Sequence, residues 1–171
     1  MTEDEYMASM QRDDPAVDAA GLIAAYEAGI DELRGAVAGM TREQTRARPV
    51  VGKWSTIEVV AHVADMEVFF ADRIERTLAM DRPLLVSVDE AHYAGRLGYQ
   101  SFDLEEELGL FSALRRHVAR ILRNQPPDAW QRQAVHTSAG LLTVRQLVIN
   151  PTRHARHHLP FIAEKRAALG L

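Results

Sequence analysis

The longest helix signal in the chain is residues 55–80, with the sequence STIEVVAHVADMEVFFADRIERTLAM. Ser55 and Glu58 form a capping-box pattern, in which each side chain satisfies a backbone N–H at the start of a helix. Apolar residues then recur every three or four positions as far as Ile74, and Pro83 closes the segment. This pattern predicts a long amphipathic helix with a wide apolar face.

Similar start and stop signals on both sides of this segment predict three more helices, over residues 14–39, 103–125 and 143–170. The first is expected to begin at Asp14-Pro15, because a proline at the first helical position loses no hydrogen bond. Pro151 and Pro160 fall inside the last helix, where each removes a backbone hydrogen bond, and we expect a kink near Pro151.

Four helices of similar length predict an all-α four-helix bundle, arranged up-down-up-down with one or two longer connections. Residues 81–101 are the main crossover loop, and residues 130–140 form another loop. No segment shows the alternation expected of a β-strand. We expect residues 1–13 to be a disordered or loosely docked tail and residues 14–171 to form one domain.

The composition excludes several functions. The chain has 171 residues with 20 Lys and Arg against 24 Asp and Glu, a net charge of −4, so nothing favours a nucleic acid as partner. It contains no cysteine, which excludes disulfides, thiolate metal sites and a cysteine nucleophile. No stretch is long and apolar enough to span a membrane, and the acidic N-terminus does not resemble a signal peptide, so we expect a cytoplasmic protein.

Histidines on two predicted helices indicate a metal site. His154 and His158 are four residues apart, so their rings lie on one helical face, together with apolar residues. His62 lies on the buried face of the 55–80 helix. A buried histidine is also a common hydrogen-bonded core residue, but three that face each other across a bundle would suit one divalent ion. Zinc is the default for three imidazoles, with nickel, iron or manganese as alternatives.

Neighbouring residues narrow the type of site. Ala155 follows His154, so the glutamate of the His-Glu-x-x-His metalloproteases is missing, and the Glu-x-x-His pairs of di-iron bundles are absent as well. Asp65 and Glu58 lie one helical turn from His62 and are candidates to orient its ring, although Glu58 also has a capping role. Arg153 and Arg156 either face an anionic substrate or solubilise the outer face.

Two segments resemble the DinB-like superfamily. The stretch 52–67, GKWSTIEVVAHVADME, is similar to the second-helix signature of that superfamily, and the stretch from His154 to Ile162 is similar to its His-x-x-His-His-x-x-x-Ile ending. The resemblance implies a four-helix bundle, commonly a homodimer, that holds a divalent metal through His62, His154 and His158. His157 matches a position that is frequently histidine but is not a ligand.

The resemblance also bears on activity. Known members are thiol-dependent S-transferases and isomerases that use mycothiol, bacillithiol or glutathione, together with some hydrolases. Pro151, Pro160 and Phe161 depart from the usual pattern and bear on the substrate class. We therefore expect a metal-dependent enzyme that activates an external low-molecular-weight thiol toward a small-molecule substrate. The alternatives are a metal-dependent hydrolase and a non-catalytic bundle that binds a small ligand or a protein.

Overall fold

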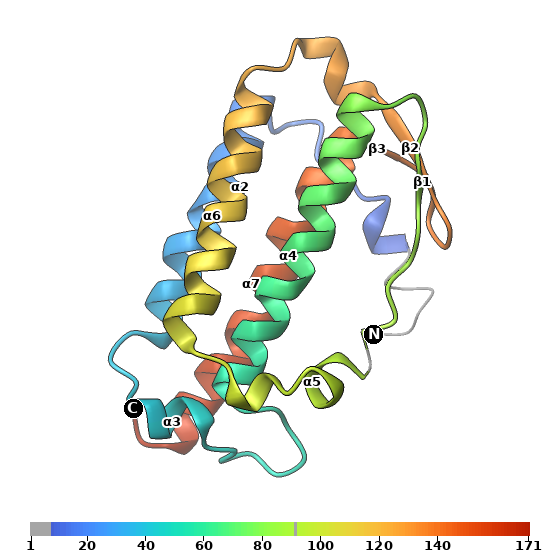
Figure 1. The fold of residues 1–171 in the computed structure, drawn as a ribbon. Helices are drawn as coiled ribbons and strands as arrows, with labels where there is room; N and C mark the ends of the chain where they lie inside the picture. The colour runs from blue at the N-terminus through green and yellow to red at the C-terminus, as the bar shows by residue number, and fades with distance from the viewer. Residues whose placement is uncertain (1–7, 91) are drawn as a thin grey trace.

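The structure is a computed structural model that describes residues 8–90 and 92–171. Within this part of the chain, four helices of 19 to 25 residues pack side by side (Figure 1). They are α2 (Ala19–Val37), α4 (Thr56–Ala79), α6 (Leu104–Arg123) and α7 (Val144–Ala168). The predicted all-α four-helix bundle is confirmed.

The connections contain short elements. The helical ones are α3 (Arg42–Arg46), α5 (Tyr93–Arg96), η1 (Tyr99–Ser101) and η2 (Pro127–Gln131). Three strands form one small sheet in the order β1 (Leu84–Leu85), β2 (Gln133–His136) and β3 (Gly140–Thr143). β1 is parallel to β2, and β2 is antiparallel to β3. The prediction that the chain has no strand was wrong, because strands of two to four residues are too short to show a readable alternation.

The order of the helices around the bundle differs from the predicted up-down-up-down arrangement. α2 and α4 each pack against both α6 and α7, so consecutive helices α2 and α4 are diagonal partners. Figure 1 shows α4 and α6 running in the same direction. This is possible because the segment between them returns to the first half of α4, where Tyr99 donates a hydrogen bond to Asp65 and the capping residue Ser55 donates one to Gln100.

The predicted start of α4 is confirmed in atomic detail. The Ser55 hydroxyl accepts from the backbone N–H of Glu58, and the Glu58 carboxylate accepts from the backbone N–H of Ser55 at 2.7 Å. Thr143 caps α7 in the same way through Gln146. α7 continues through both of its prolines without interruption. No helix among the described residues combines the length and apolarity needed to cross a membrane.

The N-terminal region departs from the sequence-based expectation. α2 begins after Asp18, whose side chain caps Gly21 at 2.7 Å, and not at Asp14-Pro15. Arg145 of α7 holds the earlier segment in a turn by donating to Asp13 Oδ1 and to the carbonyl of Val17. A local sequence pattern does not predict this contact, because Arg145 is more than 120 positions from its partners. Residues 1–7 of the predicted tail lie outside the described part.

The rest of the predicted tail is docked on the bundle. Met10 is 2% exposed within the apolar core, and Asn150 of α7 donates a hydrogen bond to its carbonyl. Arg153 donates to the carbonyl of Ser9 at 2.6 Å, and Gln11 donates to the carbonyl of Ala139. Residues 9–11 therefore contact α7 and the turn between β2 and β3.

A buried guanidinium group joins the four long helices. Arg115 of α6 is fully buried and donates to Glu67 of α4 at 3.1 Å, to the carbonyl of Tyr26 in α2 at 2.6 Å and to the carbonyl of Pro151 in α7 at 2.8 Å. The Tyr26 hydroxyl donates to the same Glu67 carboxylate. The guanidinium also stacks on the rings of Tyr26 and Phe111. This network fixes the positions of α4 and α7 relative to each other.

Candidate metal centre

α4 and α7 bring three histidine side chains together in the bundle interior. His62 projects from the first half of α4, and His154 and His158 project from successive turns of α7. Nε2 of His154 lies 3.1 Å from Nε2 of His62 and 3.3 Å from Nε2 of His158. The ring nitrogens of the three residues lie within 4.8 Å of one another. The structure thus brings together the three residues predicted from the sequence.

Hydrogen bonding among the rings does not account for this arrangement. A ring nitrogen carries either one proton or one lone pair. Nε2 of His154 therefore shares a hydrogen bond with at most one of its two neighbours. The other contact then lacks a proton aligned along it, so at best it is the weaker half of a bifurcated bond. A cation between the three nitrogens would use all three lone pairs.

The electrostatic state of the rings suits a cation. Burial lowers the pKa of His62 to about 4 and that of His158 to about 3. Burial, reinforced by the neighbouring histidines, also lowers the pKa of His154 well below its ordinary value. All three imidazoles are therefore neutral at pH 7, and the neutral imidazole is the form that binds a metal.

Aromatic side chains surround the three histidines. The ring of Trp54 packs 5.2 Å from that of His62, Phe70 packs edge-on 5.4 Å from His154, and Phe161 packs edge-on 5.5 Å from His158. His62 is only 2% exposed and His158 is 9% exposed. These rings limit the access of water to the cluster, which strengthens electrostatic interactions inside it.

The residues predicted to orient His62 have other partners. The Glu58 carboxylate is held by the Ser55 N–H and by two hydrogen bonds from Arg48. Asp65 accepts a hydrogen bond from the buried Tyr99 hydroxyl at 2.5 Å. Nδ1 of His62 and Nδ1 of His158 have no hydrogen-bond partner among the described residues. Neither candidate therefore contacts His62: Glu58 has the capping role that the sequence also indicated, and Asp65 is held by Tyr99.

The charged residues beside the pair on α7 are also engaged elsewhere. Arg156 forms a forked ion pair with Glu32 of α2, with contacts of 2.8 to 3.2 Å. Arg153 binds the docked N-terminal segment through the carbonyl of Ser9. Of the two alternatives for these arginines, contact with an anionic substrate is therefore not supported. His157 is exposed, and its ring packs against His158 and Phe161.

The nitrogen positions fit a divalent ion of ordinary size. Zinc binds imidazole nitrogen at about 2.0–2.1 Å, and tetrahedral ligands at that distance are about 3.3–3.4 Å apart. The two observed separations from His154, 3.1 and 3.3 Å, are close to this value. Three neutral nitrogen donors also suit nickel or iron. The described residues of the cluster therefore form a possible metal site with a position left open for another ligand.

The sequence pattern did not indicate one further buried histidine, His136. His136 is 4% exposed at the end of β2 and lines a cavity together with Phe70. In the sequence it is a lone histidine in a predicted loop, without a second histidine at helical spacing. His136 ends β2, just before the turn into β3, and this hairpin was not predicted from the sequence.

Comparison with known proteins adds information about the class of protein. A profile of the DinB superfamily matches residues 25–162. A Geobacillus thermodenitrificans protein, provisionally named a metal-dependent hydrolase, is 29% identical over 149 residues, which cover 86% of this chain and 84% of that protein. An Oceanobacillus iheyensis protein with the same provisional description is 25% identical over 130 residues, covering 76% and 75%.

A solved structure shows a similar fold. YfiT from Bacillus subtilis, provisionally described as a metal-dependent hydrolase with an unusual four-helix bundle topology, superposes with a TM-score of 0.80. The two chains are 23% identical, and the match covers 89% of this chain and 87% of YfiT. The superfamily profile extends from the first helix of the bundle into the last. This chain therefore belongs to the DinB superfamily.

Proposed function

We propose that this protein is a metal-dependent hydrolase in which His62, His154 and His158 hold one divalent ion. The observation that carries the proposal is the convergence of three neutral Nε2 atoms, with separations of 3.1 and 3.3 Å from His154, which cannot both be linear hydrogen bonds to its single proton or lone pair. The names of the relatives support hydrolysis as the reaction class. Zinc is the ion we expect, because three imidazoles with an open position are typical of catalytic zinc.

The side chains of the cluster have defined roles in this proposal. Low pKa values keep the imidazoles of His62 and His158 neutral at pH 7, so each ring has one nitrogen lone pair available to a metal. Trp54, Phe70 and Phe161 restrict water around the rings. A divalent ion bound there would polarise a substrate carbonyl and activate water for attack.

The thiol-transferase expectation involves the same three histidines and differs in the nucleophile. The relatives' names describe hydrolases, and they contain no reference to a thiol. Water is therefore the nucleophile in our proposal. Homodimer formation and a cytoplasmic location remain predictions from the sequence.

The proposal is tested by hydrolysis of p-nitrophenyl acetate. We expect activity that disappears when the protein is stripped with a chelator and returns when zinc is restored, while circular dichroism shows that the helices persist. His158→Ala should abolish this activity and His157→Ala should keep most of it. Each assay is repeated with glutathione and 1-chloro-2,4-dinitrobenzene, which detects thiol transfer directly.

The outcomes separate the candidate functions. Metal-dependent ester hydrolysis without added thiol supports the proposal. Turnover that strictly requires the thiol would replace it with a transferase. Stoichiometric metal without turnover in either assay would support a non-catalytic bundle, and activity unaffected by stripping would refute a metal-dependent mechanism.

A further inference from the structure

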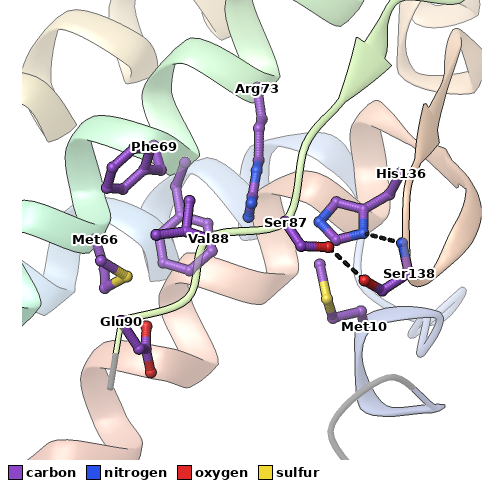
Figure 2. A pocket seen from close by; sticks show the side chains of 10 residues that line it. Met10, Met66, Phe69, Arg73, Ser87, Val88, Glu90, His136 and Ser138 are labelled. Carbon is purple, nitrogen blue, oxygen red and sulfur yellow. Dashed lines mark hydrogen bonds between the residues drawn. The ribbon is translucent and has the colours of Figure 1, made fainter. Parts of the chain in front are cut away.

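A cavity lies beside the histidine cluster, sharing the side chain of Phe70 with it. It occupies about 160 Å³ between α4, the segment that follows β1, and the turn between β2 and β3. Phe70 lines this cavity and also packs against His154, so it forms a wall between the two places. Figure 2 shows Arg73, Ser87, His136 and Ser138 at one end of the cavity and Glu90 at the other.

The hydrogen-bonding state of His136 is fixed by the backbone. Its Nδ1 accepts from the backbone N–H groups of Ser138 and Ala139, at 3.3 and 3.2 Å. An acceptor nitrogen carries no proton, so the single proton of the neutral ring is on Nε2. Burial, with a smaller effect of the Arg73 charge, lowers the pKa of His136 to about 4, which keeps the ring neutral at pH 7.

The Nε2–H group is a buried donor that lacks an acceptor. Nε2 of His136 has no hydrogen-bond partner among the described residues, although the residue is only 4% exposed. Buried polar groups are nearly always paired in folded proteins. In Figure 2 this nitrogen points into the cavity, toward Arg73 and Ser87. The donor is therefore placed to receive an acceptor from a ligand.

The charges of the cavity favour an anionic acceptor at the His136 end. Arg73 is 7% exposed, and its guanidinium is positioned by a hydrogen bond to the carbonyl of Val86 at 3.0 Å. At the opposite end, burial raises the pKa of Glu90. An anionic group would be repelled by Glu90 when that residue is ionised and attracted by Arg73. Met10, Met66 and Phe69 provide apolar walls between the two ends.

We propose that this cavity binds a small carboxylate with an apolar body, whose carboxylate accepts from Nε2–H of His136 beside Arg73. The body packs against Met66, Phe69 and Phe70. The volume is similar to that of an engineered cavity of about 150 Å³ that holds benzene. Benzoate is therefore a suitable probe. The inference does not depend on the metal proposal, because none of the three clustered histidines lines the cavity.

The test compares benzoate with benzyl alcohol, a neutral molecule of similar shape, by isothermal titration calorimetry. His136→Asn keeps an oxygen at the position of Nδ1 for the two backbone donors and removes the Nε2 donor. The matched control is His117→Asn, because His117 is an exposed histidine on α6 that does not line the cavity. We expect saturable binding of benzoate, at least tenfold tighter than benzyl alcohol, with at least a tenfold loss in His136→Asn and no change in His117→Asn.

A measurement on the unmodified protein keeps the test valid if His136→Asn fails to fold. In a ¹⁵N-histidine NMR spectrum, we expect the Nε2–H signal of His136 to shift on addition of benzoate and to stay in place with benzyl alcohol. Benzoate binding should also persist in His158→Ala, which separates this site from the histidine cluster. Equal binding of the two probes, or equal binding of benzoate by His136→Asn, would overturn the proposal.

Discussion

At the scale of single residues, Arg115 is a buried charge that depends on several hydrogen-bond partners at once. It is fully buried, it pairs with the buried Glu67, and its two terminal nitrogens donate to carbonyls of α2 and α7. Taking such a charge pair out of water is costly, and the pair is stable only while every partner is present. Arg115 therefore has a structural role, in which it connects α6 to the other three long helices, and we do not consider it a candidate catalytic group.

Replacing Arg115 with methionine should destabilise the protein strongly. The substitution leaves Glu67 buried without its cation and removes the donors to the carbonyls of Tyr26 and Pro151. The expected loss is about 3 to 5 kcal/mol in the free energy of unfolding, measured by urea denaturation. The double variant Arg115→Met, Glu67→Gln should recover part of this loss. A loss below about 1 kcal/mol would contradict the assigned role.

Gly29 is a second constrained residue, because Arg115 packs directly over it. A Cβ atom added at Gly29 would lie 2.0 Å from Nη1 of Arg115, whereas one added at Gly35 of the same helix would meet nothing within 4 Å. Gly29→Ala should therefore lower the free energy of unfolding by about 1 to 3 kcal/mol. Gly35→Ala should raise it by about 0.5 to 1 kcal/mol, because alanine favours a helix. Equal effects of the two substitutions in thermal unfolding would show that Arg115 does not occupy this space.

At the scale of secondary-structure elements, the β2–β3 hairpin is the part of the fold that a local pattern does not reveal. β2 and β3 have four residues each, and β1 has two. Their pairing depends on the return of the chain past α4, where Arg73 and Arg76 hold the carbonyls of Val86 and Leu84. The starts of α4 and α7 were better predicted than that of α2, because capping at Ser55 and Thr143 uses residues only three positions apart.

His136 should make the stability of this hairpin region depend on pH. Its pKa is lowered to about 4 in the folded protein, while an unfolded histidine has a pKa near 6.5. The unfolded chain therefore binds the extra proton between these values, so stability is fully present above pH 6.5 and is lost as the pH falls to 4.

Urea denaturation of the unmodified protein and of His136→Asn from pH 7 to pH 4 measures this contribution. As the pH falls from 6.5 to 4, the unfolding free energy of the unmodified protein should decrease relative to that of His136→Asn by roughly 1 kcal/mol for each pH unit. A difference that stays constant over this range would mean that His136 is protonated as readily in the folded state as in the unfolded state.

At the scale of the whole molecule, the bundle brings the histidine cluster together through helices that are far apart in the sequence. His62 and His154 are separated by 92 positions, and their approach depends on the packing of α4 against α7. Helical periodicity predicts that each residue faces inward, and the spacing of His154 and His158 predicts that they share a face. These two local facts were sufficient to nominate the cluster.

Local sequence patterns did not predict several other features of the whole molecule, because these depend on contacts between distant residues. The parallel run of α4 and α6 is set by contacts such as Tyr99 with Asp65, which join residues 34 positions apart. The docking of residues 8–13 depends on Asn150 and Arg153 of α7. The hydrogen-bond partners of Glu58 and Asp65, which displaced their predicted roles, come from Arg48 and Tyr99. Each of these contacts requires the assembled bundle.

The most direct test of the metal proposal is elemental analysis of the protein purified without added metal or a nickel column. The unmodified protein and His157→Ala should each contain close to one divalent ion per chain, because His157 is exposed and outside the three-nitrogen cluster. His158→Ala should lose most of that metal, since it removes one of three converging donors. Absence of a stoichiometric ion from the unmodified protein, or equal occupancy in His158→Ala and His157→Ala, would contradict the account.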